Sequence, residues 1–152
     1  MPHKRLLRKM FQSYWRLSRS LSLDVRACVR DAQGRVALVR LSDSAMWQFP
    51  GGIVEQGETA AGALSRLLFQ DAGLEGAGDA TLFAVYAGTE AARFDQRALF
   101  LVPSWRRLDA GMVNAPADIA FFEAGRLPHD TDPAVPVRLA EISRARALSE
   151  VW

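Results

Sequence analysis

The stretch from Trp47 to Leu74 constrains the fold most strongly, because it predicts four consecutive elements in a fixed order. Trp47 to Pro50 is typical of a short apolar strand that ends in a Pro-Gly-Gly turn. An acidic loop containing Glu55 and Glu58 follows the turn. Thr59 to Ala72 then predicts a helix. A strand, a glycine turn, an acidic loop and a helix in this order indicate an α/β domain with a site at the turn.

The predicted helix has recognisable ends and an apolar side. Thr59 suits the N-cap, and Gly73 suits the C′ position that ends the helix. Leu64 and Leu68 lie one turn apart and are expected to face the core. Gly62 lies inside the helix, where glycine costs about 1 kcal/mol relative to alanine. We therefore expect this helix to depend on packing.

The same stretch resembles the signature of the Nudix hydrolases. That signature is a glycine, five residues, a glutamate, seven residues and then R-E-U-x-E-E-x-G-U, where U is a bulky aliphatic residue. The residues of this chain that fall on the pattern are Gly52, Glu58, Arg66, Leu68, Gly73 and Leu74. The resemblance implies a mixed sheet between helices and covers most of the chain from about Leu23 onward, although only this box is specific.

The three glutamate positions of the signature are altered. A helix brings such positions together along one side, and in the family the glutamates hold Mg²⁺ (or Mn²⁺) against a diphosphate. Here they are Leu67, Gln70 and Asp71. Leu67 cannot bind metal, Gln70 offers a neutral oxygen, and Asp71 is one methylene shorter than glutamate. We therefore predict that Mg²⁺-dependent hydrolysis is weak or absent.

Some acidic groups remain as candidates for the site. The resemblance implies the metal ligands Gly52, Glu55, Gln70 and Asp71, because a carbonyl of the glycine turn helps to bind metal in the family. It implies the catalytic residues Glu58, Arg66, Asp71 and Asp118. A Glu58–Arg66 ion pair is the structural alternative for both of its members. For Asp118, the alternative is a solvated acid at a strand edge.

Substrate contacts are predicted at Arg40, Gly51 and Gly52. Arg40 ends a predicted strand, where the family often places an arginine, and its alternative role is a solvated charge. Trp47 and Phe49 are expected in the core rather than on a nucleobase. The resemblance implies a nucleoside diphosphate derivative, or another phosphate ligand, as substrate. A homodimer is an expectation from the family alone.

The rest of the chain predicts further strands and a second helix. Leu23 to Arg30 alternates, and the turn signal that follows it predicts a hairpin with Val36 to Leu41. Further elements are expected at Leu82 to Tyr86, Ala98 to Val102 and Ile119 to Phe122 as strands, and at Val137 to Leu148 as a helix with Leu139, Ile142 and Leu148 inward. These elements suggest that the fold class is α/β, and the resemblance implies a Nudix-like α/β/α sandwich with a mixed central sheet.

Length and charge indicate one domain preceded by a basic N-terminal segment. The 152 residues suffice for one sizeable core, which we place at 21–152, after a basic N-terminal segment at 1–20. Basic and aromatic residues at 4–19 would suit a membrane, nucleic acid or partner, but a helix docked by its aromatic residues is the preferred interpretation. Cys28 is expected to be buried. No signal peptide or apolar run of about 18 residues is found, which favours the cytoplasm.

Three functional hypotheses remain at this point. The preferred one is a Nudix-superfamily protein with weak or lost hydrolysis. The first alternative is a non-catalytic module of the same fold that binds a nucleotide or a partner. The second is a basic protein that contacts membrane or RNA through residues 4–19.

Overall fold

The computed structural model describes residues 21–89, 95–109 and 117–152, so the predicted basic segment at 1–20 lies outside the described residues. The main sheet has four strands in the order β3-β1-β6-β5. Their bounds are Leu23–Val29 for β1, Gly51–Ile53 for β3, Thr81–Ala87 for β5 and Gln96–Val102 for β6. Strand β1 runs parallel to β6 and antiparallel to β3, so the sheet is mixed as predicted.

The alternation in β1 places its apolar side chains on one face. Val25, Ala27 and Val29 are fully buried there. Cys28 on the other face is also buried, as predicted. Both faces of this strand are therefore covered, which agrees with its central position in the sheet.

The predicted hairpin between the first two strands forms only at its turn, where Arg30 and Val36 make an isolated antiparallel bridge. The turn itself forms, with the Gly34 amide donating to the Asp31 carbonyl at 2.9 Å. Strand β2 (Val36–Leu41), however, pairs antiparallel with β8 (Ala117–Phe122) in a separate two-stranded sheet. One reason is that β6 pairs along the whole of one edge of β1 and β3 pairs with Asp24–Arg26 on the other, so β2 cannot pair along β1.

The predicted helix forms in two parts. An α-helix, α2 (Ala60–Leu67), is followed by a π-helical turn, η1 (Leu68–Ala72). The Thr59 hydroxyl accepts from the Gly62 amide at 3.0 Å, which confirms the predicted N-cap. Gly73 adopts φ 62° and ends the turn, also as predicted. Its amide donates to the Leu68 carbonyl, the wider spacing that defines a π-helix.

The second helix is shorter than predicted. Helix α3 spans Ala134–Ile142, and Leu148 lies beyond it with 58% of its surface exposed, so the inward placement of Leu148 is wrong. Arg144 adopts φ 61°, which is incompatible with a continuing helix. Two short strands, β4 (Leu74–Gly76) and β7 (Trp105–Arg107), pair beside the main sheet.

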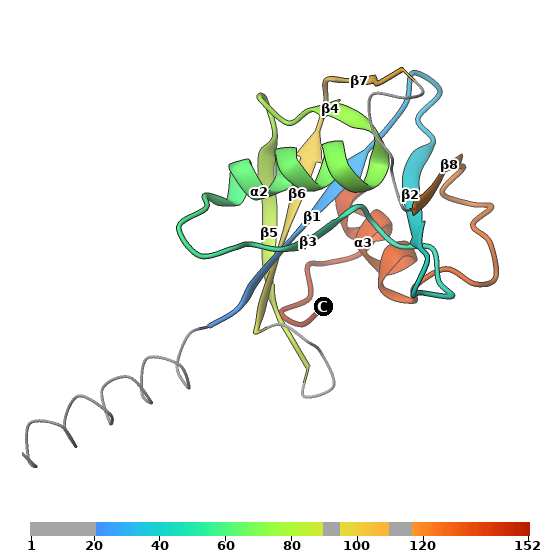
Figure 1. Ribbon diagram of the computed structural model, residues 1–152. Helices are drawn as coiled ribbons and strands as arrows, with labels where there is room; N and C mark the ends of the chain where they lie inside the picture. The colour runs from blue at the N-terminus through green and yellow to red at the C-terminus, as the bar shows by residue number, and fades with distance from the viewer. Residues whose placement is uncertain (1–20, 90–94, 110–116) are drawn as a thin grey trace, which may run out of the picture.

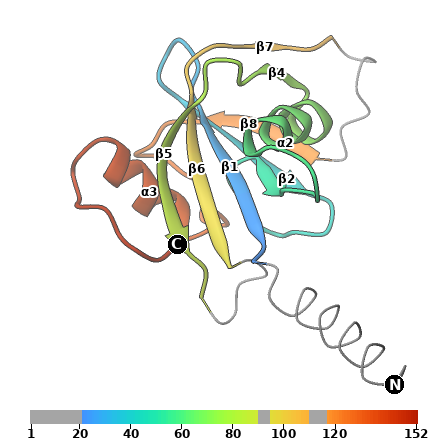
Figure 2. The ribbon, with the colours of Figure 1, turned by 90° about the vertical axis from the view of Figure 1, so that its left-hand side faces the viewer.

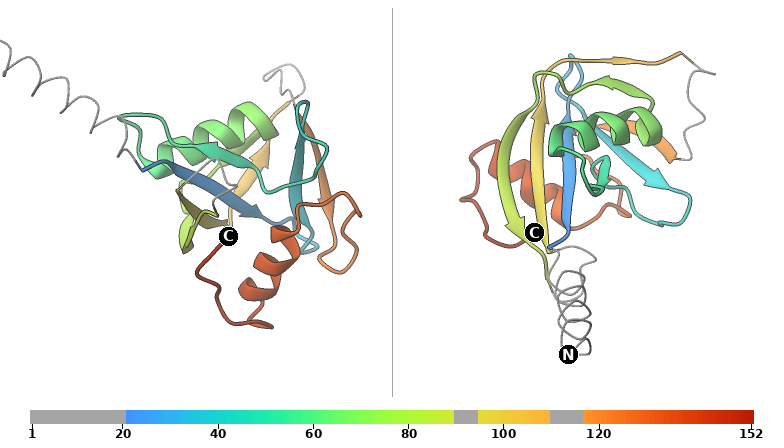
Figure 3. Two further views of the ribbon diagram at one scale, coloured as in Figure 1. Left: turned by 90° about the horizontal axis from the view of Figure 1, so that it is seen from below. Right: turned by 60° about the vertical axis from the view of Figure 1, so that its left-hand side comes forward.

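The helices cover opposite faces of the main sheet, which gives the α/β/α architecture (Figures 1 and 2). Figure 3 shows α2 and α3 on either side of β1. One apolar cluster packs beneath α2, where Leu64 and Leu68 are buried as predicted. A second cluster lies beneath α3 and includes Leu139. Within the described ranges, no helix has the length and apolar character needed to cross a membrane.

Candidate functional site

The glycine turn is part of the main sheet. The strand predicted at Trp47–Pro50 is wrong in its position, because β3 begins at Gly51 and pairs with β1 from there. Gly51 adopts φ 149°, and a β-carbon on it would lie 1.9 Å from the Val25 carbonyl oxygen. Glycine is therefore required at this position by the close approach of two backbones. Trp47 and Phe49 are buried, which confirms their place in the core.

Leu67 lies directly against the glycine turn. A β-carbon on Gly52 would lie 3.3 Å from Leu67 Cδ2 and 3.6 Å from Cδ1. Leu67 is only 8% exposed and belongs to the apolar cluster beneath α2. The first altered glutamate position is therefore occupied by a packed aliphatic side chain, at the place where α2 meets the turn.

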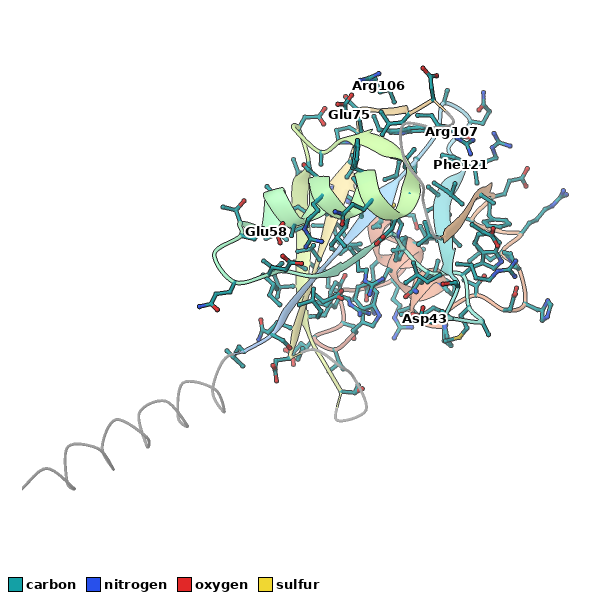
Figure 4. All side chains as sticks on the ribbon, in the orientation of Figure 1. Asp43, Glu58, Glu75, Arg106, Arg107 and Phe121 are labelled. Carbon is teal, nitrogen blue, oxygen red and sulfur yellow. The ribbon has the colours of Figure 1, made fainter. Side chains whose placement is uncertain are left out.

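Arg66 and Glu58 form a two-pronged ion pair. Nε of Arg66 donates to Oε1 of Glu58 at 2.7 Å, and a terminal guanidinium nitrogen donates to Oε2 at 2.9 Å. Figure 4 shows Glu58 beside the first turn of α2. The Arg66 hydrogen bonds lower the pKa of Glu58 to about 2. The sequence-based alternative of a Glu58–Arg66 ion pair is thus confirmed in its geometry.

The Arg66 guanidinium also contacts two more of the predicted site residues. Arg66 donates to the Ile53 carbonyl at 3.2 Å, which ties α2 to the end of β3. It also reaches the side-chain oxygen of Gln70 at 3.5 Å and lies 3.9 Å from the Glu55 carboxylate. The Glu55 side chain is 72% exposed, so its contact with Arg66 is a weak surface interaction. The acidic loop is therefore organised around Arg66.

Asp71 is the one acidic residue among the three altered positions. It lies in η1 and is half-buried. Burial raises the pKa of Asp71, and the charges of Arg66 and Arg26 oppose that rise. Burial disfavours the charged form of this carboxylate, which is the form that binds a cation.

The residues present do not fit a carboxylate-bound magnesium cluster. Mg²⁺ prefers several oxygen ligands in near-octahedral geometry. Over residues 21–89, 95–109 and 117–152, no three Asp, Glu, His or Cys side chains converge so that they could hold a metal ion. Leu67 offers no ligand atom, and the side-chain oxygen of Gln70 already faces Arg66.

Arg40 and Asp118 form a separate group on the second sheet. The Arg40 guanidinium lies 3.3 Å from the Asp118 carboxylate and 3.3 Å from that of Asp130. It also lies over the Trp47 ring at 4.7 Å from the centroid. The turn η1 packs against β2 and β8, the strands that carry this group. Arg40 and Asp118 thus lie beside the box and are paired with each other.

A buried charge network beside the turn was missed by the sequence analysis. Asp24 is 2% exposed and accepts from Nε of Arg26 at 2.8 Å and from Nε of Arg97 at 2.5 Å. Arg26 also donates to the Phe49 carbonyl at 3.0 Å, just before the glycine turn. Burial and the neighbouring Arg26 charge lower the pKa of Arg97 to about 10. The alternation of β1, which places two charged residues on one face of a central strand, was the available signal.

The fold is shared with solved hydrolase structures. The Mutator MutT protein from Bacillus halodurans gives a TM-score of 0.65 at 14% identity, covering 86% of this chain and 85% of that one. An ADP compounds hydrolase gives 0.63 at 14% identity, covering 83% and 72%. The MutT NUDIX hydrolase from Burkholderia pseudomallei gives 0.62 at 21% identity, covering 79% and 96%. At these identities, the likeness shows the fold alone.

The sequence comparisons give the family. No curated protein matches the chain. The profile of the NUDIX domain matches residues 21–130, which include the glycine turn, the acidic loop, α2 and η1. This match spans well over half of the chain and ends at Asp130, just before α3. The chain belongs to the Nudix family.

Proposed function

We propose that this chain is a Nudix protein in which Mg²⁺-dependent hydrolysis of a nucleoside diphosphate derivative is weak or lost. The packing of Leu67 against Gly52 carries the proposal, because it puts an aliphatic side chain where the family signature has a glutamate. The pairing of Arg66 with Glu58 adds support, since it commits the Glu58 carboxylate to a structural contact.

The first alternative is a non-catalytic module that binds a phosphate-bearing ligand or a partner. The intact frame favours it, because the glycine turn, the Thr59 cap and the Arg66 contacts are all in place without the metal ligands. An active hydrolase would instead require Asp71, Asp118 and the acidic loop to assemble a reduced metal site. The position of Arg40 between Asp118 and Asp130 opposes that role for Asp118.

Turnover assays separate these possibilities. The wild type and a Leu67→Glu/Gln70→Glu variant are assayed with nucleoside diphosphate derivatives while the Mg²⁺ concentration is varied. Derivatives of ADP belong in the panel, because a solved structure of the same fold is described as an ADP compounds hydrolase. We expect negligible turnover by the wild type and a gain in the double variant, since two carboxylates would then accompany Asp71.

A matched control isolates the effect of charge. In Leu67→Gln/Gln70→Glu, the glutamine at position 67 has the shape of glutamate but no negative charge. Its gain in turnover should therefore be smaller than that of the double glutamate variant. Robust wild-type turnover that Asp71→Asn abolishes would contradict weak or lost hydrolysis. Saturable binding of a nucleotide without turnover would favour the non-catalytic alternative.

The remaining expectations stay predictions. Phe69 is 43% exposed on η1, which makes it a candidate contact in the expected homodimer. The cytoplasmic location also stays a prediction. For the alternative that rests on residues 4–19, salt-dependent binding to anionic vesicles or RNA, with and without those residues, is the direct measurement.

A further inference from the structure

The Trp152 side chain lies on the sheet face that α3 covers. Its ring contacts Phe49 at a centroid distance of 6.4 Å and Tyr86 at 5.4 Å, both edge to face. The guanidinium carbon of Arg97 lies 4.6 Å from the Trp152 ring centroid, and that of Arg138 lies 5.4 Å from it. We name these four residues the Trp152 site. Aromatic edges and guanidinium planes are the groups that recognise a planar aromatic ring.

Most of the Trp152 site is fixed by contacts that do not involve Trp152. Arg97 is held by the buried Asp24 carboxylate. Arg138 is 2% exposed and lies 3.0 Å from Glu141, which also accepts from the Tyr86 hydroxyl at 2.8 Å. These contacts would therefore remain if the indole ring left. Departure of residues 149–152 would also remove the hydrogen bonds from the Ser149 amide to Glu141 and from Arg138 to the Val151 carbonyl.

The segment that carries the ring is attached to β5 and α3 by hydrogen bonds. We name residues Ser149 to Trp152 the strap. Two backbone hydrogen bonds join it to Ala87 at the end of β5, at 2.8 and 3.0 Å (Figure 2). Two side chains of α3 also bind its backbone: Arg138 donates to the Val151 carbonyl at 3.1 Å, and Glu141 accepts from the Ser149 amide at 2.9 Å. Leu148 and Val151 are 58% and 43% exposed, so Trp152 is the main apolar anchor of the strap.

The indole ring of Trp152 leaves one of its own polar groups without a hydrogen bond. The Trp152 indole nitrogen is buried and has no hydrogen-bond partner among the described residues. A buried N–H without an acceptor loses its bond to water and gains nothing in exchange. A planar ring with both donors and acceptors on its edge has more ways to satisfy its polar atoms there than an indole has.

The Trp152 site also adjoins the family motif. Phe49 precedes Gly51 by two residues, and Arg26 of the buried network donates to its carbonyl at 3.0 Å. A ring bound in place of Trp152 would therefore contact the segment that leads into the glycine turn, on the sheet face opposite α2.

We propose that the strap is a displaceable internal occupant, and that the Trp152 site admits the nucleobase of a nucleoside phosphate only when the strap leaves. The proposal deepens the proposed function, because it takes the ligand class from it and adds regulation by this chain's own residues. If the strap is docked in all but ~10% of molecules, it weakens the apparent affinity for the ligand by about tenfold.

Equilibrium binding of ADP to the full chain, measured by calorimetry in EDTA, tests the strap. We expect Trp152→Ala to bind ADP about tenfold more tightly than the wild type, because the competing ring is gone. Ser149→Ala keeps the ring but removes the hydroxyl that donates to the Val151 carbonyl at 2.9 Å, and it should give a smaller gain. Leu148→Ala, a change at an exposed residue next to the strap, should leave the affinity unchanged.

Inorganic diphosphate is the probe without a ring, and its affinity should not differ among these variants. The proposal is overturned if a folded Trp152→Ala variant binds ADP no more tightly than the wild type, or if diphosphate gains as much as ADP. Should Trp152→Ala fail to fold, Ser149→Ala decides, and wild-type affinity in that variant also overturns the proposal. Because EDTA prevents hydrolysis, these results are independent of the turnover assays that test the proposed function.

Discussion

Leu67 lies next to Gly52 across the junction of α2 and β3, with Leu67 Cδ2 3.3 Å from the place where a β-carbon on Gly52 would lie. A β-carbon on Gly52 would be closer to Leu67 than most real β-carbons are to their neighbours, so Leu67 occupies the space that a side chain at position 52 would need. The helix is thereby packed onto the turn by an apolar contact at a position where the family signature has a carboxylate. The same side chain, Leu67, therefore packs the helix onto the turn and removes a metal ligand.

The Leu67–Gly52 contact predicts coupled mutational effects. Gly52→Ala should destabilise the wild type, because the added methyl group forces Leu67 to move. In a Leu67→Ala background, the same change should cost less, and the coupling free energy should be about 1 kcal/mol. Urea unfolding of the four variants measures it. Strictly additive effects would show that the two residues do not press on each other.

Two consecutive residues of η1 are predicted to differ sharply in their contribution to the free energy of unfolding. Leu68 is 1% exposed, whereas Phe69 is 43% exposed. Leu68→Ala should lower the free energy of unfolding by about 2–5 kcal/mol, because it leaves a cavity in the core. Phe69→Ala should lower the free energy of unfolding of the monomer by far less. Equal losses in chemical denaturation would contradict the burial pattern of this turn.

The Glu58–Arg66 pair predicts a specific dependence on pH. The pKa of Glu58 is about 2 in the folded chain against an ordinary value of 4.5. A lowered pKa means that the pair stabilises the fold fully above about pH 4.5 and that this contribution is lost as the pH falls through about 2. Glu58→Gln does not titrate and should be less stable than the wild type near neutral pH.

The difference in unfolding free energy between Glu58→Gln and the wild type should therefore shrink as the pH falls from 4.5 towards 2. Thermal or urea unfolding across this range measures the difference. A difference that is the same at every pH would mean that the charge of Glu58 contributes nothing to stability.

The buried network predicts a large cost for removing its carboxylate. Asp24 is the shared acceptor of Arg26 and Arg97. Asp24→Asn should destabilise the fold by about 3–5 kcal/mol, because two buried guanidinium groups lose the charged carboxylate that they share. Asp31→Asn is the matched control, since its ion pair with Arg35 lies in an exposed turn. A loss no greater than that of the control would contradict a structural role for the network.

Local signals in the sequence predicted the elements that local contacts determine. The Thr59 cap, the Gly73 end and the buried pair Leu64 and Leu68 are confirmed, because each depends on residues within one or two turns of the helix. The α/β class is confirmed for a similar reason, since alternation and turn residues mark the strands. The mixed sheet, which the family resemblance implied, is confirmed as well.

Contacts between distant segments were not predictable in the same way. The pairing of β2 with β8 depends on which edges of β1 are already occupied, and nothing near Val36 signals that. The partners of Arg40 are 78 and 90 residues away. The π-helical turn is likewise invisible to a pattern that assumes α-helical spacing throughout. Trp152 lies at the far end of the described chain from Phe49 and Arg97, and so the Trp152 site emerged only from the structure.

Equilibrium binding of Mn²⁺, followed by electron paramagnetic resonance, tests the central claim most directly, because it measures the metal site without assuming a substrate. Leu67→Glu/Gln70→Glu is compared with the wild type and with the shape-matched Leu67→Gln/Gln70→Glu control. We predict no saturable site in the wild type at millimolar Mn²⁺ and a site gained in the double glutamate variant. Stoichiometric binding by the wild type that is lost in Asp71→Asn would contradict this account.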